Sequence, residues 1–499
     1  MVRLVMMNPL YQICAAALFL SSSVILANEN NQLLDAVRNG DNEAVQKLLQ
    51  SKTDINLAAA DGTTALHWAA HESDTALVNL LLVHGANPDA ANDYGITPLW
   101  LACTNQNADM VQKLLQADAN PNTALWTGET VLMNCAQTGT TGAVKALLEH
   151  GANVNASESK KGQTALMWAA ANSHSEVTGL LVKQGANISA KSASGFTPLL
   201  FAARSGDVES AQILMGAGAS PDEATEIQGN ALVIASAGGH EELSLLLLKA
   251  GANPNSTDEN GITALHHSAR NGLSALNGVR YDDSYRVRPP NMLKLARALL
   301  ESGADPNARI KKSQRLGPDG SPFEMAEATP LWLAAIAADV NLMKLMDEFE
   351  ADPTVNGEGD ITPLMAAARS ACTGSCAFSG GNEASEEEVQ ISLLAVKAAI
   401  EMGVDVNAKN KDGQTAMHMA AFTGSDAVVQ YLADQGADIN VKDNYGETPW
   451  SMASGISPVL RYRGLYGTHT STAALLVKLG AVTTSRDTMD PNAPPPPGQ

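Results

Sequence analysis

Residues 411–443, KDGQTAMHMAAFTGSDAVVQYLADQGADINVKD, hold one complete structural unit of this chain. Asp412-Gly413 predicts a tight turn, because glycine adopts the positive φ that other residues resist. Thr415 is placed to cap a short helix that ends at Gly424. A second helical pattern of apolar residues follows and ends at Gly436, which predicts a left-handed C-cap. The stretch therefore predicts a turn followed by two short helices.

The same unit returns along the chain with a period near 33 residues. Its closing Gly-Ala-Asn, or a near variant, begins at Gly85, Gly151, Gly185, Gly218, Gly251, Gly303, Gly403, Gly436 and Gly480. Asp118 and Glu350 take the place of glycine in two copies, so we expect them at positive φ with a strain of about 1 kcal/mol each. A period of this length predicts a solenoid of stacked helix pairs, which offers a long surface to partners.

The unit resembles the ankyrin repeat. The quoted copies TALHWAA at 64–70 and TALHHSA at 263–269 follow the pattern Thr-Pro/Ala-Leu-His-x-Ala-Ala, and Gly-Ala-Asn/Asp-x-Asn closes each unit. About twelve such units cover 30–485, and we place the solenoid at 28–487. The resemblance implies an all-α repeat solenoid of helix-turn-helix repeats with short β-hairpin loops.

Four insertions break the period, all in the C-terminal half. They lie near 272–290, 310–328, 370–387 and 455–468. The second falls in a hairpin between repeats, and the other three fall between the two helices of alternate repeats, so these three should crowd one edge of the stack. The segment 488–499, which contains four consecutive prolines, is expected to be a disordered tail.

The first 27 residues have the pattern of an export signal. Arg3 is followed by an interrupted apolar stretch, and Ala27 offers a small residue for cleavage. The stretch is short and serine-rich for a membrane span, although an uncleaved N-terminal anchor is the alternative. We therefore expect a periplasmic or secreted protein with no membrane span after the signal is removed.

The charge balance restricts the class of partner. The formal net charge is −21, and only 4% of the residues are aromatic. Such an acidic chain disfavours binding to nucleic acid or to anionic membranes, so no nucleic-acid partner is expected.

Four cysteines lie beyond the signal. Cys103 and Cys135 occupy small positions of neighbouring inner helices, where the sequence favours buried free thiols. Cys372 and Cys376 lie in an insertion and could close a disulfide loop in an oxidising compartment. A zinc site at that pair would need further ligands, so no metal is expected.

The histidines do not predict catalysis. The resemblance implies that His67, His266 and His418 make structural hydrogen bonds, whereas His71, His267 and His469 have no assigned role. The chain has no Gly-x-Ser-x-Gly motif and no phosphate-binding glycine-rich loop. We expect no enzyme and no cofactor; the alternative is an enzyme with a site in the insertions.

Partner contacts in this family come from the hairpin tips and from the inner-helix residues that follow Ala-Ala. Carried onto this chain, the resemblance selects the tips Tyr94 and Trp126 and the helix residues Arg204, Arg270 and Phe422. For each of these the alternative is a solvated surface residue. Trp68, Trp168 and Phe201 lie where the repeat carries leucine, so they are predicted to be core.

Two insertions are rich in tyrosine and arginine, the residue types that dominate binding hot spots. The selected residues are Tyr281, Tyr285, Arg286 and Arg288 in one insertion and Arg461, Tyr462, Arg463 and Tyr466 in another. They could form a partner-binding edge, or they could fold over the stack and cap it. The sequence thus predicts a scaffold, monomeric by itself, that binds a partner protein; a secreted effector that binds a host protein is the alternative.

Overall fold

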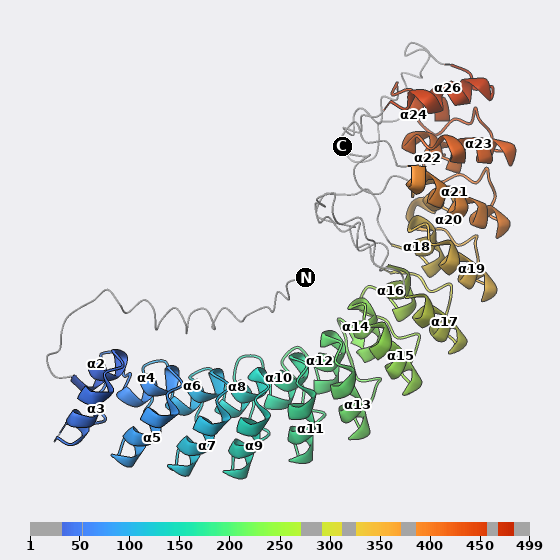
Figure 1. The fold of residues 1–499 in the computed structure, drawn as a ribbon. Coiled ribbons are helices and arrows are strands. Elements are labelled where there is room, and N and C mark those ends of the chain that lie inside the picture. The colour runs from blue at the N-terminus through green and yellow to red at the C-terminus, as the bar shows by residue number, and fades with distance from the viewer. Residues whose placement is uncertain are drawn as a thin grey trace. The chain divides into compact units, whose positions relative to one another are not determined.

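The computed structural model describes residues 32–51, 53–270, 292–311, 326–370, 386–456 and 468–483. These residues form twelve pairs of short helices with very little sheet (Figure 1). The all-α repeat solenoid and the number of repeats predicted from the sequence are confirmed. The chain divides into two compact units, Met1–Ala165 and Leu166–Gln499, and each is described by itself.

In the first unit, inner and outer helices alternate along the chain and form two rows (Figure 1). The inner helices are α2 (Gln32–Arg38), α4 (Ala65–His71), α6 (Pro98–Thr104) and α8 (Val131–Thr138). The outer helices are α3 (Asn42–Leu49), α5 (Thr75–Val83), α7 (Ala108–Gln116) and α9 (Thr141–Glu149).

The second unit continues the same alternation. Its inner helices are α10 (Ala165–Ala171), which begins at the last residue of the first unit, α12 (Pro198–Ser205), α14 (Ala231–Ala237), α16 (Ala264–Arg270), α18 (Pro330–Ile336), α20 (Pro363–Arg369), α22 (Ala416–Thr423) and α24 (Pro449–Ala453). Its outer helices are α11 (Ser175–Lys183), α13 (Val208–Gly216), α15 (Glu241–Lys249), α17 (Leu293–Glu301), α19 (Val340–Glu348), α21 (Glu386–Glu401), α23 (Asp426–Asp434) and α26 (Thr470–Lys478).

Local sequence starts and stops these helices. Thr97 accepts a hydrogen bond from the backbone N–H of Trp100, and Pro98 follows at the first helical position, where its missing N–H costs nothing. Gly436 closes α23 at φ 86°. Asp118 and Glu350 adopt φ values of 63° and 58°, so the positive φ predicted for them is confirmed.

Part of the core lies between neighbouring inner helices, where small side chains allow close approach. Ala69, Ala70 and Ala102 are at most 1% exposed. The prediction of free thiols at the next such positions is wrong, because Cys103 and Cys135 form a disulfide between α6 and α8. Their Cα atoms lie 4.9 Å apart, a separation that a disulfide spans readily.

The recurring asparagine has a physical role in joining repeats. Asn56 donates from Nδ2 to the carbonyl oxygen of Gly85 at 3.2 Å, and its Oδ1 accepts from the N–H of Asn87 at 2.7 Å. Asn122, Asn255, Asn407 and Asn440 make the same two bonds to the following repeat. In these five repeats a single side chain thus sets the register between closing loops.

Short hairpins connect the repeats. In one of them, β1 (Ala224–Thr225) pairs antiparallel with β2 (Gly229–Asn230). Adjacent tips are joined directly, since the N–H of Asp93 donates to the carbonyl of Asp61 at 2.9 Å and that of Asn444 donates to Asp412 at 2.8 Å. Residues at the tips therefore stand on a continuous backbone framework.

The described residues around the insertions keep the repeat geometry. The N–H of Ile310 donates to the carbonyl of Ala328 at 3.2 Å, across the base of one insertion. Helix α21 has sixteen residues, whereas α19 and α23 have nine each. The additional turns lie at its N-terminal end, next to the insertion near 370–387.

Candidate binding surface

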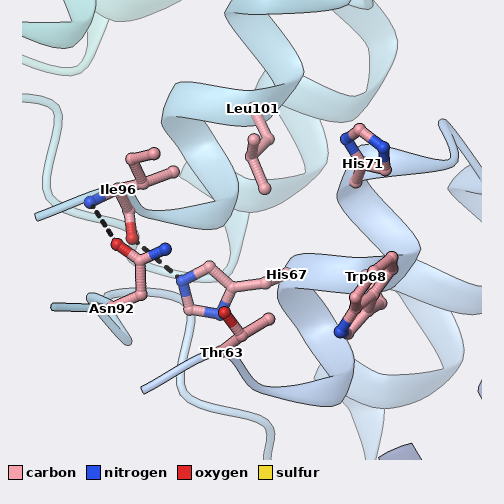
Figure 2. Close-up of a pocket in the computed structure, with 7 residues that line it drawn as sticks. All are labelled: Thr63, His67, Trp68, His71, Asn92, Ile96 and Leu101. Atoms are coloured by element: carbon pink, nitrogen blue, oxygen red, sulfur yellow. Dashed lines mark hydrogen bonds between the residues drawn. The ribbon is translucent and has the colours of Figure 1, made fainter. Parts of the chain in front are cut away.

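The three predicted structural histidines join neighbouring repeats. Nδ1 of His67 accepts from the N–H of Thr64 at 3.1 Å, and Nε2 donates to the carbonyl of Ile96 in the next repeat at 2.9 Å (Figure 2). These two bonds require a neutral ring with its proton on Nε2. The structural role predicted for these residues is confirmed, because His266 and His418 repeat the arrangement toward Ala328 and Glu447.

Burial keeps these rings neutral. It lowers the pKa of His67 below its ordinary value and lowers the pKa of both His266 and His418 to about 4, against the weaker opposing effect of the carbonyl bonds. Both ring nitrogens are used in hydrogen bonds within the protein, so neither is available to bind a substrate or to transfer a proton.

Trp332 occupies the same position in α18 and replaces the histidine. Its Nε1 donates to the carbonyl of Ile361 at 3.0 Å, and the residue is 1% exposed. This substitution was not predicted from the sequence. The signal was Thr329-Pro330-Leu331-Trp332, which matches the Thr-Pro-Leu-His pattern with another N–H donor in the last place.

A small hollow lies beside His67 and is lined by Thr63, His67, Trp68, His71, Asn92, Ile96 and Leu101 (Figure 2). Its volume of about 10 Å³ holds no more than one water molecule. Trp68 stands at its margin, with His71 edge-on at 5.9 Å and the Arg38 guanidinium 4.9 Å from the ring. This hollow is too small for an organic substrate.

The core prediction for three aromatic residues is partly wrong. Phe201 is 3% exposed, as predicted, but Trp68 and Trp168 are only half-buried. An indole is larger than the leucine that usually fills this position, so part of it extends onto the surface.

The two selected hairpin tips present large aromatic surfaces. Trp126 is 80% exposed and Tyr94 is 47% exposed. They lie on adjacent hairpins, and a Cβ placed on Gly95 would lie 3.5 Å from Cα of Leu125, which shows how closely the tips approach. Ile227, at another tip, is 60% exposed and was not selected from the sequence.

Arginines follow the small residues of two described inner helices, α12 and α20, and contact aromatic rings. Cζ of Arg204 lies 5.0 Å from the centroids of both Phe196 and Phe201. Burial against these rings lowers the pKa of the Arg204 guanidinium. Arg369 lies 5.4 Å from the ring of Phe422.

Arg38 occupies the equivalent position in α2, over Trp68, and was missed because the first repeat lacks the Ala-Ala signal. The side chain of Arg270, at the same position in α16, lies outside the described residues.

The comparison with family models completes this picture. A model described as "Ankyrin repeats (3 copies)" matches residues 33–125, 117–192, 199–281 and 386–462, well over half of the chain. The chain belongs to the ankyrin repeat family.

One solved ankyrin structure among those similar to this chain is the ankyrin repeat domain of Bcl-3, whose title calls it a unique member of the IkappaB protein family. It is 26% identical over 42% of this chain and 95% of its own, with a TM-score of 0.38. No curated protein matches the chain.

The ankyrin assignment is consistent with a protein-interaction module. In the part of the chain that the structure describes, no group of three or more His, Cys, Asp or Glu side chains could hold a metal ion. None of the described helices is long and apolar enough to cross a membrane.

Several selected residues of this ankyrin chain lie outside the described residues and stay predictions. They are Tyr281, Tyr285, Arg286, Arg288, Arg461, Tyr462, Arg463, Tyr466, Cys372 and Cys376, together with the signal 1–27 and the tail 488–499.

Proposed function

We propose that this ankyrin protein is an exported scaffold that captures a partner protein through its hairpin tips and the last turns of its inner helices. The observation that carries the proposal is the exposure of Trp126 and Tyr94, at 80% and 47%, on the hairpin tips of adjacent repeats. Exposed aromatic residues of this size are favourable anchors, because they bury a large area at little conformational cost.

The proposal includes no catalytic step. The three histidines of the Thr-x-x-His pattern use both ring nitrogens in structural bonds, and the small hollow beside His67 holds no substrate. The tyrosine- and arginine-rich segments at 281–288 and 461–466 extend the proposed surface on grounds of composition.

We further propose that the protein works in the periplasm or outside the cell. The signal-like segment 1–27 supports export, and the buried disulfide between Cys103 and Cys135 supports an oxidising compartment, where such bonds persist. Fractionation of the native cell, with alkylation of free thiols in denaturant and without reductant, tests this, because both cysteines are 0% exposed in the folded protein. Recovery in the cytoplasm with both thiols alkylated would refute it, whereas recovery in the medium would favour a secreted effector.

Affinity capture from the periplasm tests the binding function. The Trp126→Ala/Tyr94→Ala variant should lose at least about ten-fold in partner capture, since hot-spot truncations cost more than 1 kcal/mol each. Val83→Ala is the matched control, because Val83 is 75% exposed but lies on the outer helix α5. Equal capture by all three proteins, at equal thermal stability, would refute the proposed tips.

A further inference from the structure

Arg204 is held against two aromatic rings at the end of α12. Both Phe196 and Phe201 are 3% exposed, and their rings pack at 5.3 Å with an interplanar angle of 58°. The Arg204 residue itself stays exposed above this fixed pair. The rings attract the positive charge of the guanidinium and accept no hydrogen bond from it. Its N–H groups therefore stay able to donate hydrogen bonds to a ligand.

No acceptor for these donors is present in the described part of the chain. Arg204 takes part in no ion pair with another described residue, and no carboxylate contributes to the shift of its pKa. A partly desolvated cation without a counter-ion is notable in a chain of net charge −21, which has acidic residues in excess.

The neighbouring repeats hold the backbone of Arg204 in place. The Oγ of Ser205 donates to the carbonyl of Ala170 at 2.9 Å, in the preceding helix. From the following repeat, Nε2 of His240 donates to the carbonyl of Arg204 at 3.2 Å, and the His240 ring fills the space beside Gly206 that a Cβ would need. The guanidinium is therefore presented from a framework fixed on both sides, which reduces the entropic cost of binding.

We propose that Arg204 anchors an acidic peptide segment of the partner protein, with its guanidinium bound to one carboxylate. The planar fork of an arginine matches a carboxylate with two parallel hydrogen bonds. One guanidinium can pair with one carboxylate. A polyanion such as nucleic acid would instead be repelled by the net negative charge of the chain. The inference rests on the proposed binding function and specifies its partner chemistry.

Selection from a displayed library of short random peptides, on the full chain, tests this inference. We expect the recovered peptides to be enriched in Asp or Glu, or to depend on a free C-terminal carboxylate. A recovered peptide should bind Arg204→Gln at least about ten-fold more weakly than the wild type, as expected for the loss of a charge-assisted bond. Arg204→Lys should retain part of the affinity, because it keeps the charge without the fork.

Lys183→Gln is the control for charge, since Lys183 is an exposed cation at the end of the outer helix α11. It should change the affinity by less than about two-fold, the size of a surface electrostatic effect. Each recovered peptide is also synthesised with Glu→Gln changes and with an amidated C-terminus, which distinguishes a side-chain carboxylate from a terminal one. Thermal unfolding of each variant identifies any that has lost its fold.

Recovered peptides without acidic groups, or with equal affinity for the wild type and Arg204→Gln, would overturn the inference and leave the binding function standing. Failure to recover any peptide would also overturn it. If periplasmic capture then yields no partner either, the proposed function fails as well.

Discussion

Two contacts between successive repeats of the second unit, here called joints, use different side chains to make the same hydrogen bond to a backbone carbonyl. Between α16 and α18, His266 reaches the carbonyl of Ala328, whereas between α18 and α20, Trp332 reaches the carbonyl of Ile361. Both residues are at most 1% exposed. At these two positions an N–H donor of the right reach makes the bond to the next repeat, and the ability to titrate is dispensable.

Removal of the N–H donor should cause the largest loss in the free energy of unfolding. The loss should be greater at the tryptophan joint than at the histidine joint. Trp332→Ala is expected to destabilise its unit by about 4 kcal/mol, since it leaves a large cavity and an unbonded carbonyl. His266→Ala should cost about 2 to 3 kcal/mol, because the cavity is smaller. Urea unfolding with hydrogen exchange of α18 and α20 measures both. A cost for Trp332→Ala below that of His266→Ala would contradict the comparison.

The first unit adds a covalent joint between α6 and α8. Cys103→Ser/Cys135→Ser should destabilise this unit by about 3 kcal/mol, because it releases a loop of roughly 30 residues in the unfolded chain. Urea unfolding of the double variant, compared with the reduced and oxidised wild type, tests this. The reduced wild type should resemble the variant; unchanged stability in both would show that the cross-link contributes nothing.

Acid should weaken the histidine joints and spare the tryptophan joint. The pKa of His266 and that of His418 lie near 4 in the folded protein, below the ordinary value of 6.5, so the unfolded chain binds more protons between these values. Stability from each histidine is complete above pH 6.5 and decreases as the pH falls toward 4, by about 2 kcal/mol at pH 5.

The control for this acid effect is His418→Gln, which removes one titrating ring and leaves every carboxyl group in place. The variant should lose less stability than the wild type between pH 7 and pH 5, as followed by urea unfolding. An identical loss in the two proteins would show that His418 does not titrate as the structure indicates.

Replacement of the tryptophan donor by a histidine donor should cause the smallest loss in the free energy of unfolding. It also compares the two donors at a single position. Trp332→His keeps an N–H donor at the α18–α20 joint but leaves unfilled volume, so we expect a cost of about 1 to 2 kcal/mol at pH 7. The joint should then become sensitive to acid. Hydrogen exchange of α20 at pH 7 and pH 5 measures this, and equal acid sensitivity before and after the exchange would refute the comparison.

Much of the fold was predictable from the sequence because its signals are local. Thr97-Pro98 caps a helix, and Gly436 ends one, through contacts within a few residues. The period near 33 then predicts the stack. The candidate surface was predictable in part: Tyr94 and Trp126 follow from their hairpin positions, but Arg38 and Ile227 were missed because the first repeat is atypical and tip side chains vary.

The sequence by itself determined the repeat and its helix caps, because the caps depend on residues close together in one unit. Only the tertiary structure decided that Cys103 bonds Cys135, that Nε1 of Trp332 reaches the carbonyl of Ile361, and that Arg204 lies over two rings with no carboxylate partner among the described residues. The cysteine bond and the tryptophan bond link residues about thirty positions apart, and the state of Arg204 depends on which groups surround it in space. Helix packing brings such groups together, and no local pattern records the distances that result.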